Sequence, residues 1–208
     1  MSKLSVSQRH YLEQAAEAYH GQISPSAAAY LVSRGITKEI AATYRLGNVV
    51  DPLVGDDEYT GRVSIPYITP SGVVDIRFRS IRPDQTPKYL SRSGAETKLY
   101  NVQAVLKKSD VICICEGEID AITMDGMVGV PAVGVPGANN WRSHFRLLFE
   151  DYDRVLVMCD GDQAGRDFGK KLAGEIDGAT IINLPEGSDV NDIYMAEGSD
   201  GIKERIGL

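Results

Sequence analysis

The stretch VICICEGEID, residues 111–120, decides the fold expected for this chain, because an apolar run leads directly into three carboxylates. Two later runs share this order: 154–159 precede Asp160 and Asp162, and 179–184 precede Asp189 and Asp192. A fourth apolar run, 131–135, opens into a glycine-rich loop. Helix-length segments separate the runs, and this alternation is typical of parallel strands joined by right-handed crossovers. We therefore expect an α/β domain in which helices cover both faces of a parallel sheet.

The carboxylates that follow these strands are expected to meet at one edge of the sheet. Parallel pairing places the carboxyl ends of all strands on one side, where open α/β sheets bind ligands. Two carboxylates about 4 Å apart repel by roughly 4 kcal/mol at an effective dielectric constant near 20, so the cluster requires a cation. Oxygen ligands without His or Cys suit Mg²⁺ or Mn²⁺. The pattern predicts a divalent metal site containing Glu116, Asp160 and Asp162, with Glu118 and Asp120 as possible additional acids.

Helix capping is the alternative role for these acids. An Asp at a strand-to-helix junction can accept hydrogen bonds from the free amides of the first helical turn. One acid at each junction is enough for a cap, whereas the first and second motifs each carry more than one. Gly117 and Gly161 allow backbone turns that a side chain could obstruct. The repetition of the pattern favours the metal site over simple caps.

Charge is distributed unevenly along the 208 residues, whose net charge is −7. Residues 1–109 carry 14 basic and 10 acidic side chains, whereas 110–208 carry 8 basic and 19 acidic ones. The basic excess is concentrated in 59–108, with 9 basic and 3 acidic side chains. A basic region beside an acidic one suits a phosphate-bearing partner that lies across the first and reaches cations held by the second.

Several classes of protein are excluded by composition. No apolar run is long enough to cross a bilayer and no signal-peptide pattern follows Met1, so we expect a soluble, cytoplasmic protein without a membrane partner. Cys113, Cys115 and Cys159 lie inside predicted strands without zinc-ligand spacing, which argues against disulfides and structural zinc. The three histidines lie outside the acidic motifs, so imidazole acid or base chemistry is not indicated.

The N-terminal part is expected to be helical up to a linker at 51–58. Helices are predicted over Val6–Tyr19, Ala27–Arg34 and Lys38–Arg45, the last two after Ser24-Pro25 and Thr37 as start signals. A further helix is predicted over Trp141–Phe149 in the acidic half.

A half-buried strand is predicted after the linker, because Val74, Ile76 and Phe78 alternate with polar residues. Residues 62–68 form its predicted partner strand, and 69–72 supply the turn. This small sheet carries or adjoins a set of basic side chains: Arg62, Arg77, Arg79, Arg82, Lys88, Arg92 and Lys98. As a set they suggest a phosphate-tracking surface, although each alone could be an ordinary surface charge. Tyr89 could stack a nucleic-acid base or simply pack within the sheet.

Three motifs resemble the signatures of the TOPRIM domain, which primases share with topoisomerases: CEGEID at 115–120, DGDQAG at 160–165 and LPEGSDVND at 184–192. The segments upstream resemble the RNA polymerase core of DnaG-type primases: GRVSIP at 61–66, RFR at 77–79, PKYL at 87–90 and LY at 99–100. The resemblance extends over roughly residues 25–197. The EGE form of the first motif and VPGAN at 135–139 are more similar to phage and plasmid primases, which suggests a compact mobile-element protein, possibly phage-encoded in a bacterial host.

The resemblance implies a division into four segments: an N-terminal helical segment and linker at 1–58, a basic mixed α+β subdomain of the primase type at 59–109, a TOPRIM catalytic domain at 110–197 and a tail at 198–208. The family usually places a zinc-binding module before this core and a helicase-binding domain after it, and neither pattern is found in the sequence. We therefore expect a separate zinc-binding module, a replicative helicase or both as partners.

The resemblance implies DNA primase activity, in which ribonucleoside triphosphates are joined on a single-stranded DNA template. In this scheme Glu116, Asp160 and Asp162 are catalytic and hold Mg²⁺ or Mn²⁺, and Asp189 with Asn191 or Asp192 contributes to a second ion. The nucleotide and DNA phosphates would contact Arg62, Arg77, Arg79 and Lys88, beside Tyr89. The rival functions are a TOPRIM metal-dependent nuclease, in which water replaces the sugar hydroxyl, and a non-catalytic regulator that binds nucleotides or nucleic acid.

Overall fold

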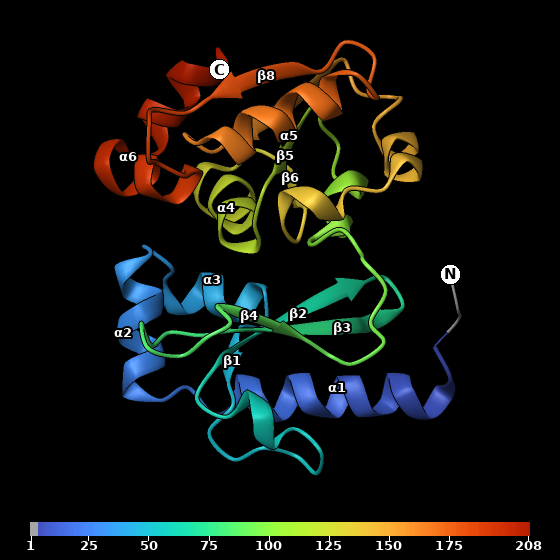
Figure 1. Ribbon diagram of the computed structural model, residues 1–208, viewed down its shortest axis with the longest axis vertical. Helices are drawn as coiled ribbons and strands as arrows, with labels where there is room; N and C mark the ends of the chain where they lie inside the picture. The colour runs from blue at the N-terminus through green and yellow to red at the C-terminus, as the bar shows by residue number, and fades with distance from the viewer. Residues whose placement is uncertain (1–3) are drawn as a thin grey trace. The chain divides into compact units, whose positions relative to one another are not determined.

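The computed structural model describes residues 4–208, which belong to two compact units divided between Glu96 and Thr97 (Figure 1). Unit 1 contains an antiparallel sheet, and unit 2 contains a parallel one. No helix among residues 4–208 is both long and apolar enough to span a membrane.

Unit 1 begins with three helices, α1 (Val6–His20), α2 (Pro25–Ser33) and α3 (Lys38–Thr43). Its strands are β1 (Gly47–Asn48), β2 (Val63–Thr69), β3 (Gly72–Arg79) and β4 (Tyr89–Ser91), ordered β1-β2-β3-β4. A short 3-10 helix, η1 (Asp57–Tyr59), lies between β1 and β2. Ser24 and Thr37 cap α2 and α3, as their place before each predicted helix indicated.

Helix α1 covers one face of the antiparallel sheet (Figure 1). Its inward side chains, among them Leu12 and Tyr19, pack with Ile76 and Phe78 of β3. Tyr59 stacks on Phe78 with the ring centroids 3.8 Å apart. Ile76 and Phe78 of the predicted alternation face this core, whereas Val73 replaces Val74 in it because the pairing with β2 shifts register between Tyr67 and Ile68.

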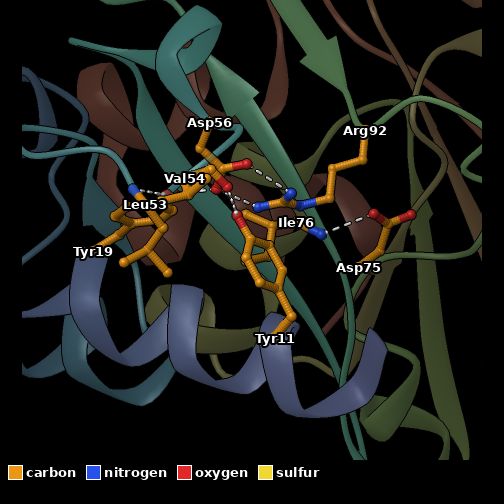
Figure 2. A network of polar contacts seen from close by, with 8 residues as sticks. All are labelled: Tyr11, Tyr19, Leu53, Val54, Asp56, Asp75, Ile76 and Arg92. Atoms are coloured by element: carbon orange, nitrogen blue, oxygen red, sulfur yellow. Dashed lines mark hydrogen bonds and ion pairs between the residues drawn. The ribbon is translucent and has the colours of Figure 1, made fainter. Parts of the chain in front are cut away.

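The segment 51–58, predicted as a linker, is a mostly exposed loop that leads into η1, but one of its acids is buried. Asp56 is completely buried, and Arg92 donates to its two carboxylate oxygens over 2.8 and 2.5 Å. Tyr19 donates its hydroxyl to the same carboxylate over 2.5 Å, and Figure 2 shows Arg92 and the tyrosines converging on Asp56. Arg92 also lies over the Tyr11 ring, 4.9 Å from its centroid. This network fixes the segment to α1 and to the chain that follows β4.

Unit 2 is built on four parallel strands ordered β6-β5-β7-β8. They are β5 (Val111–Cys115), β6 (Ala132–Gly134), β7 (Arg154–Cys159) and β8 (Thr180–Asn183). The helices are α4 (Glu118–Ile122), which continues as a π-helix η3 (Thr123–Val128), α5 (Gln163–Ala173) and α6 (Val190–Ile206). All four apolar runs singled out in the sequence form strands of this sheet.

The two faces of the parallel sheet have different covers. On one face, Ile114 and Val157 share a core with Phe168 and Leu172 of α5 and with Trp141. On the other side, α4 contacts β5 and β6, and α6 packs against α4 and η3. The predicted α/β fold with helices on both faces is confirmed, because residues facing opposite ways on each strand are buried by separate layers.

The connection between β6 and β7 differs from the predicted helix over Trp141–Phe149. It consists of two 3-10 helices, η4 (Ala138–Asn140) and η5 (Ser143–Leu148). Trp141 has an extended backbone, and its indole donates to Glu175 over 2.9 Å. The apolar spacing in this segment thus reflects packing of Trp141, Phe145 and Phe149 on one another rather than a regular α-helix.

Two boundaries differ from those expected. Residues 97–109, which include the 3-10 helix η2 (Val102–Leu106), belong to unit 2 because Tyr100 and Gly134 exchange backbone hydrogen bonds at the edge of β6. Residues expected as a C-terminal tail continue α6 to Ile206 after a kink at Gly198, where φ is 72°. Ile202 and Ile206 are buried, so apolar packing holds this last part of the helix.

Candidate functional site

The carboxyl ends of the neighbouring strands β5 and β7 bring the first two acidic motifs together. Glu116 follows β5, and its Oε1 accepts a hydrogen bond of 2.8 Å from the backbone amide of Asp160, which follows β7. The third motif joins them through the backbone, because the Gly161 amide donates to the Ser188 carbonyl over 2.9 Å and the Gly187 amide donates to the Gly161 carbonyl over 2.9 Å. Residues up to 72 positions apart in the chain therefore meet at one edge of the sheet, as predicted.

Glycines are required where these motif loops approach one another. A Cβ atom added to Gly161 would lie 1.8 Å from the Pro185 carbonyl oxygen, which no real structure tolerates. A Cβ atom on Gly165 would lie 2.2 Å from the Asp160 carbonyl oxygen and 2.7 Å from Glu116 Oε1. The glycines of the second motif therefore let the loop after β8 and the first turn of α5 close around Asp160.

Burial and mutual repulsion act on both central carboxyl groups. Burial, together with the nearby charges of Asp162 and Asp120, raises the pKa of Glu116 to about 7, against the lowering effect of the Asp160 amide. Burial and the charges of Glu116, Asp189, Asp162 and Asp192 raise the pKa of Asp160 to about 7. The Oδ1 atom of Asp160 is buried and has no hydrogen-bond partner. Among residues 4–208, the groups that act on Asp160 all disfavour its charged form, which a cation would favour.

A divalent cation suits this donor set. The central groups are carboxylates, and one buried oxygen of Asp160 still lacks a partner. Among residues 4–208, no three His, Cys, Asp or Glu side chains form a ready-made cage around one ion. Mg²⁺ is commonly held by one or two carboxylates, with water and substrate phosphates completing its octahedron. Glu116 and Asp160 fit that mode of binding, in which the protein supplies part of the coordination shell.

Capping, the alternative role for the acids, applies to part of the set. Asp162 is exposed and caps α5, accepting from the Gly165 amide over 2.8 Å. Asp189 caps α6 by accepting from the Asp192 amide over 2.7 Å, and Asp192 accepts in return from the Asp189 amide over 3.3 Å. Each cap oxygen can still face an ion, because a carboxylate accepts more than one contact. The metal roles of Asp162, Asp189 and Asp192 stay predictions.

The remaining acidic-motif residues lie inside unit 2. Asn191 is fully buried; its backbone amide donates to Asp120 over 3.2 Å and its side-chain amide donates to Thr123 over 2.9 Å. Glu118 is 1% exposed and Asp120 is 7% exposed, both in α4. Asp120 and Asn191 thus lie where α4 meets α6, and the predicted metal roles of all three residues stay predictions.

The basic side chains of unit 1 are more engaged with the protein than the sequence suggested. Arg62 is buried, burial lowers the pKa of its guanidinium, and it donates to the Pro87 carbonyl over 2.9 Å. Arg92 is paired with Asp56, and Arg82 is paired with Asp84 over 2.7 Å. The basic excess in the sequence therefore overstates the positive surface available to a phosphate chain.

A cluster of arginines and tyrosines surrounds β4. The Arg77 guanidinium lies 4.6 Å from the centroid of the Tyr89 ring, and Arg79 donates to the Tyr89 hydroxyl. Arg79 also lies 5.3 Å from the centroid of Tyr30. Lys88, next to this cluster, is exposed. Tyr89 is therefore a packing partner for arginines, and the predicted nucleic-acid contacts of Arg77, Arg79, Lys88 and Tyr89 stay predictions.

Two interactions escaped the sequence analysis. The Asp56–Arg92 pair joins residues 36 positions apart, and nothing in the acidic segment 56–58 marks one of its members as buried. Thr123, the partner of Asn191, lies just beyond the first motif, and an isolated threonine in a helix carries no signal of its own.

Comparison with known proteins agrees with these motifs. Residues 113–194 match the family model described as Toprim-like. The gene 57 protein of Mycobacterium phage D29 is 43% identical over 153 residues, covering 71% of this chain and 99% of that protein. The DNA primase of Pseudomonas aeruginosa is 28% identical over 222 residues, covering 85% of this chain and 33% of that primase. The chain thus spans about a third of the length of this bacterial relative.

Solved structures share the fold. The crystal structure of a DNA primase domain from Pseudomonas aeruginosa has a TM-score of 0.79 at 26% identity, covering 96% of this chain and 78% of that one. The structure of the DnaG primase catalytic domain bound to single-stranded DNA has a TM-score of 0.75 at 23% identity, covering 98% of this chain and 80% of that one.

Proposed function

The chain belongs to the family of DnaG-type primase cores with a TOPRIM domain, and we propose that it synthesises short RNA primers on single-stranded DNA by divalent-metal-dependent nucleotidyl transfer. The observation that carries the proposal is the pair of raised-pKa carboxyl groups, Glu116 and Asp160, at adjacent parallel strand ends. Such shifted acids in one site are candidates for function rather than for structure alone.

Glu116 and Asp160 would hold the cation, Mg²⁺ or Mn²⁺, and Asp162 lies two residues beyond Asp160 on the same loop. When bound, such an ion lowers the pKa of an attacking 3′-hydroxyl and stabilises the charge that develops on the leaving pyrophosphate. Asp189, capping α6 beside Asp192, would contribute to a second cation. The hydrogen bond from the Asp160 backbone amide to Glu116 Oε1 fixes the orientation of the Glu116 carboxylate before substrate binds.

The phosphates of template and incoming ribonucleotides would contact unit 1 through Arg77 and Lys88, and Arg79, which is 7% exposed, would support them through its contact with Tyr89. Arginine suits this role because its planar guanidinium can bind phosphate oxygens in pairs while stacking on an aromatic ring, as Arg77 does on Tyr89. The related DnaG catalytic domain solved with single-stranded DNA supports a DNA template as the partner. A zinc-binding module and a replicative helicase stay predicted partners, and priming assays with and without them would test both.

A primer-synthesis assay tests the proposal. The protein is incubated with labelled ribonucleoside triphosphates, single-stranded DNA and Mg²⁺ or Mn²⁺, and we expect short labelled RNA from the parent protein and from Asp84→Asn, an exposed control. Glu116→Gln should make none. Shortening of labelled DNA without RNA synthesis would indicate a nuclease, and neither product despite intact DNA binding would indicate a non-catalytic binding protein.

A further inference from the structure

The first turn of α6 is fixed to α4 through a small buried contact. The Asn191 backbone amide donates to Asp120 Oδ1 over 3.2 Å, and its side-chain amide donates to Thr123 Oγ1 over 2.9 Å. Thr123 in turn donates to the Ile119 carbonyl over 2.9 Å. Asn191 and Thr123 are fully buried. A buried hydrogen bond of this kind is costly to break, because the group left behind cannot reach water.

This contact joins the helix that follows the first acidic motif to the third acidic motif. Asp120 and Thr123 follow Glu116 on α4 and at the start of the π-helix η3, and π-turns within helices are frequent at functional sites. Asn191 stands between Asp189 and Asp192, which cap α6. The loop that precedes α6 is held separately, by the hydrogen bonds between Gly161 and residues 187–188. The third motif is therefore clamped from two sides, by the second motif and by the helix that follows the first.

We infer that Thr123 and Asn191 are positioning residues that set the distance of the Asp189 and Asp192 carboxylates from Glu116 and Asp160, and so the ability of the third motif to take part in cation binding. The inference rests on the proposed function. It assigns Asn191 an interior role, because both of its amide groups are engaged with α4 and η3. Groups that orient metal ligands commonly change metal affinity ten- to a hundredfold when removed.

The test uses Thr123→Val, which keeps the side-chain shape and removes the oxygen that Asn191 contacts. Thr123→Ser is the matched control, because it retains that oxygen. Two measurements on the nucleotide-free protein are compared: Mn²⁺ affinity by electron paramagnetic resonance, and hydrogen exchange of the first-turn amides of α6. We expect Thr123→Val to weaken Mn²⁺ binding about tenfold and to speed exchange at Asn191, whereas Thr123→Ser stays near the parent.

Asn191→Asp separates a positioning residue from a metal ligand. A ligand would keep or gain Mn²⁺ affinity when its amide becomes a carboxylate. A positioning residue loses affinity, because the new charge is fully buried and the amide donor to Thr123 is gone. Asn191→Asp would overturn the inference if it bound Mn²⁺ as tightly as the parent protein or more tightly. Thr123→Val would overturn it if its Mn²⁺ affinity equalled that of the parent, whatever its hydrogen-exchange rates. Both results leave the proposed function standing, whereas a parent protein that binds no Mn²⁺ would remove the proposed function and the inference together.

Discussion

Fully buried Asp56 in unit 1 and half-buried Asp160 in unit 2 have opposite surroundings. In unit 1 the side chain of Asp56 is 1% exposed, and Arg92 contacts both of its oxygens while Tyr19 donates to one. In unit 2 Asp160 has one buried oxygen without a partner, and the charges around it are other carboxylates. Burying a charge is costly unless an opposite charge accompanies it. Arg92 supplies a positive charge to Asp56 from within the chain, whereas we propose that Asp160 takes a cation from solution.

The largest expected effect is on the rate of primer synthesis, when the carboxylate charge of Asp160 or Glu116 in unit 2 is removed. We expect Asp160→Asn and Glu116→Gln to lower the rate of primer synthesis by about a thousandfold, because metal stabilisation of the transition state contributes several kcal/mol. Primer yield per unit time is measured at saturating Mg²⁺, with circular dichroism to confirm folding. A variant that retains more than a tenth of the parental rate would show that the cation is held elsewhere.

The equivalent change in unit 1 should affect stability rather than chemistry. Asp56→Asn leaves the Arg92 guanidinium largely buried without its counter-charge, so we expect the free energy of unfolding to fall by about 3–5 kcal/mol. Urea titration measures the change. Asp84→Asn removes the carboxylate of an exposed ion pair, the one between Asp84 and Arg82. It should leave the urea midpoint of unfolding unaltered. Equal midpoints for Asp56→Asn and the parent would mean that the network in Figure 2 contributes nothing.

In the metal-free protein, Asp160→Asn should raise the free energy of unfolding, whereas Asp56→Asn lowers it. Burial and neighbouring charges raise the pKa of Asp160 above its unfolded value, so the folded state favours the protonated form. Stability from this group is fully present below the unfolded pKa and is lost as pH rises through about 7. Neutralising the side chain should therefore stabilise the metal-free protein at pH 8 by about 1–2 kcal/mol after allowance for solvent screening. A destabilised variant at pH 8 would show that the carboxylate is compensated after all.

The smallest expected effect concerns the arginines of β3. Arg77→Ala combined with Arg79→Ala should weaken single-stranded DNA binding and reduce the salt slope by about 0.7 for each phosphate that the arginines neutralise in the parent protein. Fluorescence anisotropy at several salt concentrations provides the slope. Arg205→Ala, whose side chain pairs with Glu197 on α6, is the control. A double variant with the parental slope would assign both arginines to internal packing with Tyr89 and Tyr30.

The parallel sheet and the meeting of the acidic motifs were predictable because both arise from local patterns. Apolar runs of strand length alternate with helical segments, and parallel pairing alone brings Glu116 and Asp160 to one edge. The DnaG-type resemblance was confirmed for the same reason, since its motifs lie at these strand ends.

The interactions that the sequence did not reveal depend on partners far along the chain. Asp56 and Arg92 are 36 residues apart, and Thr123 and Asn191 are 68 apart, so neither pair leaves a periodic signal. Arg62 counted as positive surface because composition cannot distinguish a guanidinium that faces solvent from one that donates to the Pro87 carbonyl. Trp141–Phe149 was predicted as a helix because aromatic packing in 3-10 turns can produce a similar apolar spacing.

The most direct test of the central claim is a Mn²⁺ titration of the metal-free protein, followed by electron paramagnetic resonance at pH 6 and pH 8. The parent should bind more tightly at pH 8, because Glu116 and Asp160 must lose protons whose pKa values lie at about 7. Asp160→Asn should lose at least about tenfold in affinity at pH 8, as expected when a coordinating carboxylate is replaced, whereas Asp84→Asn should match the parent. Parental Mn²⁺ affinity in Asp160→Asn, with no dependence on pH, would contradict the claim that this unpaired carboxylate awaits a cation.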